Sequence, residues 1–184
     1  MGYAIAEAAL EAGHDVILIS GPVNLPAPSA AKLVSVSTSD EMHDTVHERI
    51  GHCDVLVMCA AVADYKPAKF SDHKIKKGRE PVSLELIPTR DILTSLPHPR
   101  KFLVVGFAAE TKNLHANAKA KLQNKNCDLV VANDVSRVDV GMESADNEVT
   151  IFFSSGEIRK ISRAPKKKIA DELVKIISNM KKNV

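Results

Sequence analysis

The chain has 184 residues, enough for one domain with a sizeable core. Hydrophobic residues make up 45% and charged residues 26%, which is the balance of an ordinary globular protein. A formal net charge of +2 is too small to favour nucleic acid or a membrane surface as a partner, and the absence of Trp disfavours a base-stacking platform. Without a long apolar run or a signal peptide, we expect a cytoplasmic protein.

Cysteine and histidine spacing argues against a disulfide framework or a metal centre. Cys53, Cys59 and Cys127 form no C-x-x-C pair, and the first two flank an apolar run. Reduced, buried thiols are therefore expected. The 7 histidines are not spaced as metal ligands, so none is assigned a role.

Helical and strand patterns alternate along the chain. Helices are indicated by apolar residues at helical spacing, as in Met42, Val46 and Ile50 after a capping Ser39, and strands by short apolar runs. Expected helices cover residues 1–12, 39–50, 91–96, 113–124 and the segment that starts at Pro165. Expected strands cover residues 15–20, 34–37, 54–58, 102–107, 128–132, 148–153 and 158–161. The fold class is α/β: a Rossmann-like, doubly wound, mostly parallel sheet with an antiparallel edge hairpin.

Two departures from the basic repeat stand out. Residues 74–77 and 83–87 are predicted to form a two-stranded arm, and such an arm is marginal unless it finds a partner, so we expect it to mediate a homodimer. A doubly wound sheet also normally begins with a strand and a Gly-rich turn, whereas this chain begins on a helix. Either another segment fills that gap or the first strand is missing from the chain.

The stretch 57–77 carries the main functional signal. A buried strand passes through small residues to Asp64, and Lys74, Lys76 and Lys77 follow. A carboxylate at the carboxyl end of a parallel strand, followed by lysines, suits a magnesium-bound nucleotide. The alternative is a strand end with a solvated Lys-rich loop, since a single motif is weak evidence.

Long motifs in the same order identify a resemblance. CAAVADYKPAKFSDHKIKK, together with MGYAIAEAAL, GHDVILISGPVNLP, TRDIL, VVGFAAET and DLVVANDV, resembles the phosphopantothenate–cysteine ligase family over nearly the whole chain. The resemblance implies a single ligase domain over residues 1–184, which uses CTP and Mg²⁺ to activate 4′-phosphopantothenate as an acyl-cytidylate that the amine of L-cysteine then attacks. It also implies a homodimer formed through the 74–87 arm and association with a flavin-dependent decarboxylase.

The resemblance assigns roles by position. Asp64 matches a nucleotide- and cation-associated aspartate and Lys74 a triphosphate lysine, so these two are the candidate catalytic residues and Asp64 the candidate metal ligand. Further nucleotide positions are Met58, Cys59, Ala60, Arg90, Asp91, Ile92, Leu93, Phe107, Lys121 and Lys125. Thr89-Arg90 stands where the family has Asn-Pro. The family's first strand and its Asn-containing substrate loop precede the position of Met1, so we expect them to be absent here.

Other interpretations stay open. Phe107 can be a core residue, Lys121 and Lys125 a solvated i,i+4 helix face, and Asn133, which follows a strand with Asp134, a turn residue. The whole chain can be a nucleotide-binding remnant without turnover. A nicotinamide-dependent Rossmann reductase is the third alternative, but it requires a G-x-G-x-x-G run that this sequence lacks.

Overall fold

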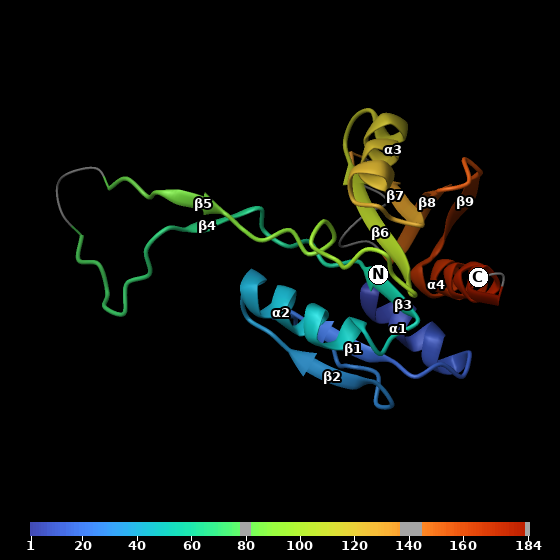
Figure 1. Cartoon of the computed structure of the whole chain (residues 1–184), viewed down its shortest axis with the longest axis horizontal. Helices are drawn as coiled ribbons and strands as arrows, with labels where there is room; N and C mark the ends of the chain where they lie inside the picture. Colours follow the sequence, from blue (N-terminus) through green and yellow to red (C-terminus); the bar gives the residue numbers. More distant parts are fainter. Residues whose placement is uncertain (78–81, 137–144, 183–184) are drawn as a thin grey trace.

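The computed structural model describes residues 1–77, 82–136 and 145–182, and a five-stranded sheet forms its centre (Figure 1). In spatial order the strands are β3 (Val55–Met58), β6 (Leu103–Glu110), β7 (Leu129–Asp134), β8 (Asp146–Phe153) and β9 (Ile158–Pro165). The first three are parallel, while β8 and β9 continue the sheet antiparallel. This confirms the predicted mostly parallel sheet with an antiparallel edge hairpin. The polar loop expected before that hairpin lies largely outside the described residues.

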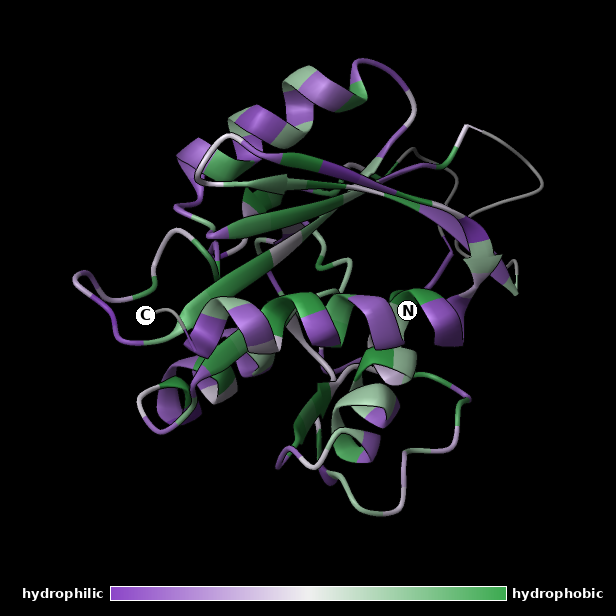
Figure 2. Cartoon of the chain, turned by 90° about the vertical axis from the view of Figure 1, so that its right-hand side faces the viewer, coloured by the Kyte–Doolittle hydropathy of each residue, from purple (hydrophilic) through white to green (hydrophobic). Residues whose placement is uncertain are grey.

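Both faces of the central strands are buried. Val105 and Val131 belong to the core cluster that includes α1 (Gly2–Glu11) and α4 (Lys166–Lys182). Their neighbours Val104 and Val130 belong to the opposite cluster, which includes α2 (Ser39–Ile50) and α3 (Leu114–Asn124). Figure 2 shows these strands as mostly hydrophobic, between helices that alternate hydrophobic and hydrophilic residues. Among the described residues, no helix is both long and apolar enough to cross a membrane.

A second, separate sheet carries the first two strands. β1 (Ile17–Ser20) pairs in parallel with β2 (Lys32–Ser35), and within the described ranges neither strand pairs with the central sheet. Because β1 and β3 each have a partner on one side only, the doubly wound sheet is interrupted between them. The expectation that another segment fills this gap, or that the first strand is missing, stays a prediction.

The arm exists, but its pairing differs from the expected one. β4 (Tyr65–Pro67) pairs antiparallel with β5 (Leu86–Pro88), and the arm extends away from the body (Figure 1). Residues 74–77 form no strand, so the predicted pairing of 74–77 with 83–87 is wrong.

Hydrogen bonds at the base of the arm explain its register. The backbone N–H of Thr89 donates to Asp64 O over 2.9 Å, and its hydroxyl donates to Ala63 O over 2.7 Å. These bonds set the register in which β4 and β5 pair as the chain leaves the body. The first pair in that register is Tyr65 with Pro88. Alternation in the sequence indicated one strand but carried no information about its partner.

Two local predictions were wrong at helix boundaries. Residues 91–96 form turns rather than a helix, because Asp91 Oδ1 accepts the N–H of Thr94 over 2.9 Å and Ser95 Oγ donates to Asp91 O. Side chains of this kind compete with the helical hydrogen-bond pattern. Pro165 ends β9 opposite Asp146 instead of beginning the last helix, which starts at Lys166.

Thr38, not the predicted Ser39, caps α2. Its Oγ1 accepts the N–H of Glu41 over 3.1 Å, and Glu41 Oε2 accepts the N–H of Thr38 over 3.3 Å. The two residues form a capping box, and Asp40 with Glu41 places negative charge in the first turn.

We expect Thr38→Ala to lower the free energy of unfolding by about 1 kcal/mol, because the Glu41 N–H loses its acceptor. Urea unfolding measures the difference. Ser39→Ala is the matched control and should change stability little, since Ser39 is inside the helix. Equal losses in both variants would contradict the assignment of the cap.

Candidate functional site

The carboxyl ends of β3, β6 and β7 bring together several of the predicted site residues. Met58 ends β3 opposite Gly106 of β6, and Cys59 and Ala60 follow it directly. Phe107 comes one residue after Gly106 and pairs with Val131 of β7. In open α/β sheets, ligands bind beyond this edge. Met58, Cys59, Ala60 and Phe107 therefore lie close together where β3 ends, and their role in nucleotide binding stays a prediction.

Lys121 of α3 reaches this edge. Its Nζ donates to the carbonyl oxygen of Phe107 over 2.5 Å. The Phe107 side chain packs against the core cluster that includes α1 and α4. The core interpretation of Phe107 is thus correct for its side chain, while its carbonyl remains at the site. Lys121 is half-buried, which argues against the solvated-face interpretation.

Asp91 lies against Lys125, one turn after Lys121 on the same helix. Asp91 Oδ2 accepts a hydrogen bond from Lys125 Nζ, while Oδ1 accepts the Thr94 N–H. Burial alone would raise the pKa of Asp91, but the hydrogen bonds from Lys125 and Thr94 outweigh it and leave the pKa lowered. A carboxylate and a cation predicted to contact the nucleotide are therefore held together.

Ile92 and Leu93 have buried side chains, at 4% and 8% exposure. Any contact of these two residues with a nucleotide must therefore come from their backbone. Gly106 makes room for Cys127, since a Cβ there would lie 3.0 Å from Cys127 Sγ, while Leu93 Cδ1 at 3.8 Å would be in ordinary contact.

Arg90 points to α2 instead of to the strand ends. Its Nη1 and Nη2 donate to the two carboxylate oxygens of Asp44 over 2.6 and 2.9 Å. Its Nε donates to Asp40 Oδ1 over 3.2 Å. Arg90, followed by His43, lowers the pKa of Asp44 from 3.8 to about 2. The expected role of Arg90 in the nucleotide site stays a prediction, and its guanidinium is already occupied.

The structure does not bring Asp64 and Lys74 to the other site residues. Asp64 is exposed just before β4, and its carboxylate has no hydrogen-bond or ion-pair partner among the described residues. Lys74 is exposed on the arm, which points away from the sheet (Figure 1). The described part of the chain has no cluster of His, Cys, Asp or Glu that would enclose a metal. A single free carboxylate fits Mg²⁺, which typically binds one or two carboxylates together with substrate phosphates.

Sequence reasoning missed the amino end of α1. Gly2 lies against Cys59, where a Cβ on Gly2 would be 3.6 Å from Cys59 Cβ. Burial raises the pKa of the Cys59 thiol. Tyr3 Oη and Ser20 Oγ are 2.9 Å apart, so α1 is also tied to the end of β1. A Cβ at 3.6 Å would be in ordinary contact, so Gly2 gave no sequence signal for this contact.

Comparison with known proteins identifies the family. The DNA/pantothenate metabolism flavoprotein C-terminal domain matches residues 1–180. The chain belongs to this family. It is 41% identical to the coenzyme A biosynthesis bifunctional protein CoaBC of Bacillus subtilis (strain 168) over 184 residues, which is 99% of this chain and 45% of that protein.

A second relative and a solved structure agree. CoaBC of Vibrio vulnificus (strain CMCP6) is 41% identical over 162 residues, covering 85% of this chain and 40% of that protein. The crystal structure of the C-terminal domain of a CoaBC protein superposes with a TM-score of 0.83 at 36% identity, over 99% of this chain and 82% of that one. The chain thus spans less than half the length of these two curated relatives. The resemblance inferred from the motifs is confirmed at the level of the family.

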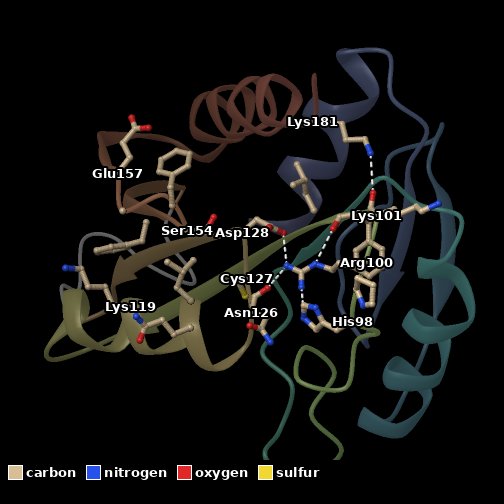
Figure 3. Close-up of a pocket in the computed structure, with 18 of the residues that line it drawn as sticks. His98, Arg100, Lys101, Lys119, Asn126, Cys127, Asp128, Ser154, Glu157 and Lys181 are labelled. Carbon is tan, nitrogen blue, oxygen red and sulfur yellow. Dashed lines mark hydrogen bonds and ion pairs between the residues drawn. The ribbon is translucent and has the colours of Figure 1, made fainter. Parts of the chain in front are cut away.

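A different hollow, of about 780 Å³, lies at the opposite edge, beside the amino ends of β6 and β7 (Figure 3). Arg100 lines the hollow, but its N–H groups already donate hydrogen bonds within the chain. The acceptors are His98 Nε2, the Phe102 and Asn126 carbonyl oxygens, and Asp128 Oδ2. Asp128 Oδ2 also accepts the N–H of Val104 over 2.7 Å. Arg100 therefore stabilises the start of the two strands, and none of the site residues predicted for this family lines the hollow.

We expect an NMR pH titration to give a carboxyl pKa of about 2 for Asp44, because the Arg90 fork stabilises the charged form. In Arg90→Gln this pKa should rise toward 3.8. Arg159→Gln, which removes the partner of Glu157 on the edge hairpin, is the control and should leave Asp44 unchanged. Because folding lowers the pKa of Asp44, the Arg90–Asp44 pair stabilises the folded protein at pH values above the unfolded pKa of 3.8. This stabilisation is lost as the pH falls from 4 to 2.

Proposed function

We propose that this chain is a CTP-dependent ligase domain that joins 4′-phosphopantothenate to L-cysteine. The observation that carries the proposal is the family match over residues 1–180, together with Lys121 at the Phe107 carbonyl and Lys125 paired with Asp91. The Bacillus subtilis relative, which matches almost all of this chain, is named as a bifunctional protein of coenzyme A biosynthesis. That name and the flavoprotein description of the family support the further proposal that a flavin-dependent decarboxylase accompanies this domain.

The chemistry needs an activated carboxylate, because a carboxylate is a poor electrophile. A carboxylate oxygen of phosphopantothenate attacks the α-phosphorus of CTP, and pyrophosphate leaves with the electrons of the broken P–O bond. The cysteine nitrogen then attacks the acyl carbon, loses a proton and displaces CMP. Preorganised cations stabilise the charge that develops on the phosphates.

The chain's own residues would divide this work by position. Lys121 would exchange the Phe107 carbonyl for a phosphate oxygen, and Lys125 would donate to a phosphate oxygen while Asp91 still holds it in place. Asp64 would hold Mg²⁺ through its exposed carboxylate. Lys74 would contact the triphosphate, and because the arm points away from the body, it must bend back or come from a second copy (Figure 1).

The deciding experiment follows pyrophosphate release with phosphopantothenate, CTP and Mg²⁺, first without and then with cysteine. Release that requires phosphopantothenate would support the ligase. CTP binding without release would favour the alternative of a nucleotide-binding remnant. Absence of both would overturn the proposal. The nicotinamide reductase gains no support, since the sequence has no G-x-G-x-x-G run.

Lys74→Ala is expected to weaken CTP binding about tenfold, the loss of one charge-assisted hydrogen bond. Calorimetry with CTP and Mg²⁺ measures it. Lys69→Ala, another exposed arm lysine, is the matched control and should bind CTP like the wild type. An unchanged affinity in Lys74→Ala would remove this residue from the site. Asp64→Asn should weaken the dependence on Mg²⁺ by the same logic.

The arm supports a homodimer. It exposes large apolar side chains that no described residue covers: Phe70 at 90%, Val82 at 75%, Ile75 at 70% and Leu84 at 66%. Exposed apolar surface of this kind marks an interaction site. A second copy of the arm has matching apolar surface and free strand edges, so a symmetric pair would bury both.

Leu86→Lys is expected to shift the protein from dimer to monomer, because it places a charge on β5 within the apolar surface of the arm. Sedimentation equilibrium reports the mass. Leu25→Lys is the control: it is 60% exposed in the loop after β1 and should leave the oligomeric state unchanged. A wild-type protein that sediments as a monomer would contradict the proposal directly.

A further inference from the structure

The turn at residues 89–96 is attached to two different helices. Asp91 faces α3 through Lys125, while the preceding residue, Arg90, faces α2. Between these two contacts the chain has only one peptide bond, so the position of one side chain limits the position of the other. The orientation of Asp91 at the site thus depends on what holds Arg90.

Arg90 is held by a nearly complete set of acceptors. The Asp44 carboxylate accepts hydrogen bonds from Nη1 and Nη2 of Arg90. The Asp40 carboxylate accepts one from Nε, and the Asp40 backbone oxygen accepts one from Nη2 over 3.3 Å. A bidentate pair fixes orientation as well as distance, which a single point charge does not. Asp40 and Asp44 are four residues apart on α2, so they present adjacent carboxylates to one arginine.

Asp40 also reaches the other strand of the arm. Its Oδ2 accepts a hydrogen bond from Lys66 Nζ of β4. The same carboxylate therefore contacts Lys66 in the first arm strand and Arg90, which follows the second. Helix α2 sets where the base of the arm lies relative to the sheet.

The far end of the turn is attached to the same helix. Ser95 Oγ lies 3.1 Å from His43 Nε2 and 2.9 Å from His47 Nε2, and it donates to Asp91 O over 2.6 Å. The two imidazole rings stack with centroids 4.2 Å apart. Both ends of the turn are thus bound by one stripe of α2, which consists of Asp40, His43, Asp44 and His47.

We propose that Asp40 and Asp44 are positioning residues for the nucleotide site, acting through Arg90 to hold Asp91 against Lys125. This rests on the proposed function, because it treats Asp91 and Lys125 as part of the CTP site. Neither α2 carboxylate contacts the nucleotide edge itself. Their effect is to keep the Asp91–Lys125 pair in one arrangement, so that binding does not have to order the turn.

The test uses Asp44→Asn in the full chain, since Asp40 has the additional contact with Lys66. The KM for CTP should rise about fivefold to tenfold while kcat changes less than twofold, because the turn is loosened and the reacting groups are unchanged. Calorimetry with CTP and Mg²⁺ should show the same loss of affinity without turnover. Asp44→Glu, which keeps the charge, should recover most of the affinity.

Two further variants separate positioning from general stability. Glu48→Gln lies one turn along α2 and loses only a 3.9 Å contact with Arg49, so it should bind CTP normally. Arg90→Gln should weaken binding at least as much as Asp44→Asn, because it also loses the Asp40 contacts, and the double variant should be no worse than Arg90→Gln alone. A fall in melting temperature with unchanged CTP affinity in Asp44→Asn would overturn the inference.

The same measurements distinguish this inference from the function on which it rests. If the wild-type protein and Asp44→Asn bind CTP equally well, the inference alone is overturned. Wild-type protein that binds no CTP would overturn both. Additive losses in the Arg90→Gln, Asp44→Asn double variant would also count against the inference, because they would require two independent effects.

Discussion

Burial of β6 and β7 on both faces is the constraint on which the rest of the structure depends. Leu129 and Val131 face α1 and α4, while Val104 and Val130 face α2 and α3, and all four side chains are nearly inaccessible. Strands covered in this way have only their ends free for polar chemistry. The side chains that can bind a ligand therefore gather at the carboxyl edge, on α3 and on the turn packed beneath α2.

At that edge the charged groups are already paired within the chain. Lys121 donates to a carbonyl and Lys125 to a carboxylate, so neither ammonium group lies unpaired in a partly buried place. An unpaired charge there would carry a desolvation cost. In the proposed function, a phosphate would replace the Phe107 carbonyl at Lys121 and share Lys125 with Asp91 instead of meeting bare cations. The carbonyl of Phe107 is the weaker partner, so Lys121 is the cation more easily released to a ligand.

Much of the fold follows from the sequence, and the exceptions share a physical cause. Unbroken apolar runs indicated the central strands, and helical spacing indicated Val46 and Ile50 as the buried side of α2. The arm register, the Thr38 cap and the turn at Asp91 were missed. Each depends on which of several nearby polar groups finds a partner, and hydrophobic periodicity carries no information about that choice.

The site was predictable to a similar depth. Motif positions indicated Met58, Phe107 and Lys121, which lie together where β3 ends, and Lys125, which instead pairs with Asp91; their roles stay predictions. The direction of the Arg90 side chain was not predictable, because its partners Asp40 and Asp44 lie 50 and 46 residues earlier in the chain. Long-range ion pairs of this kind become visible only when the helix has been placed.

Arg90 also shows how one substitution changes the physics of a loop. The family resemblance places a proline here, and proline fixes its own φ at about −65° without needing any partner. Arginine leaves the backbone free, so the same turn requires an external hold, and α2 supplies it through two carboxylates. Where the resemblance leads us to expect a covalent restraint, this chain has an exposed electrostatic one. Because salt screens exposed charges, this segment depends on ionic strength in a way that a proline does not.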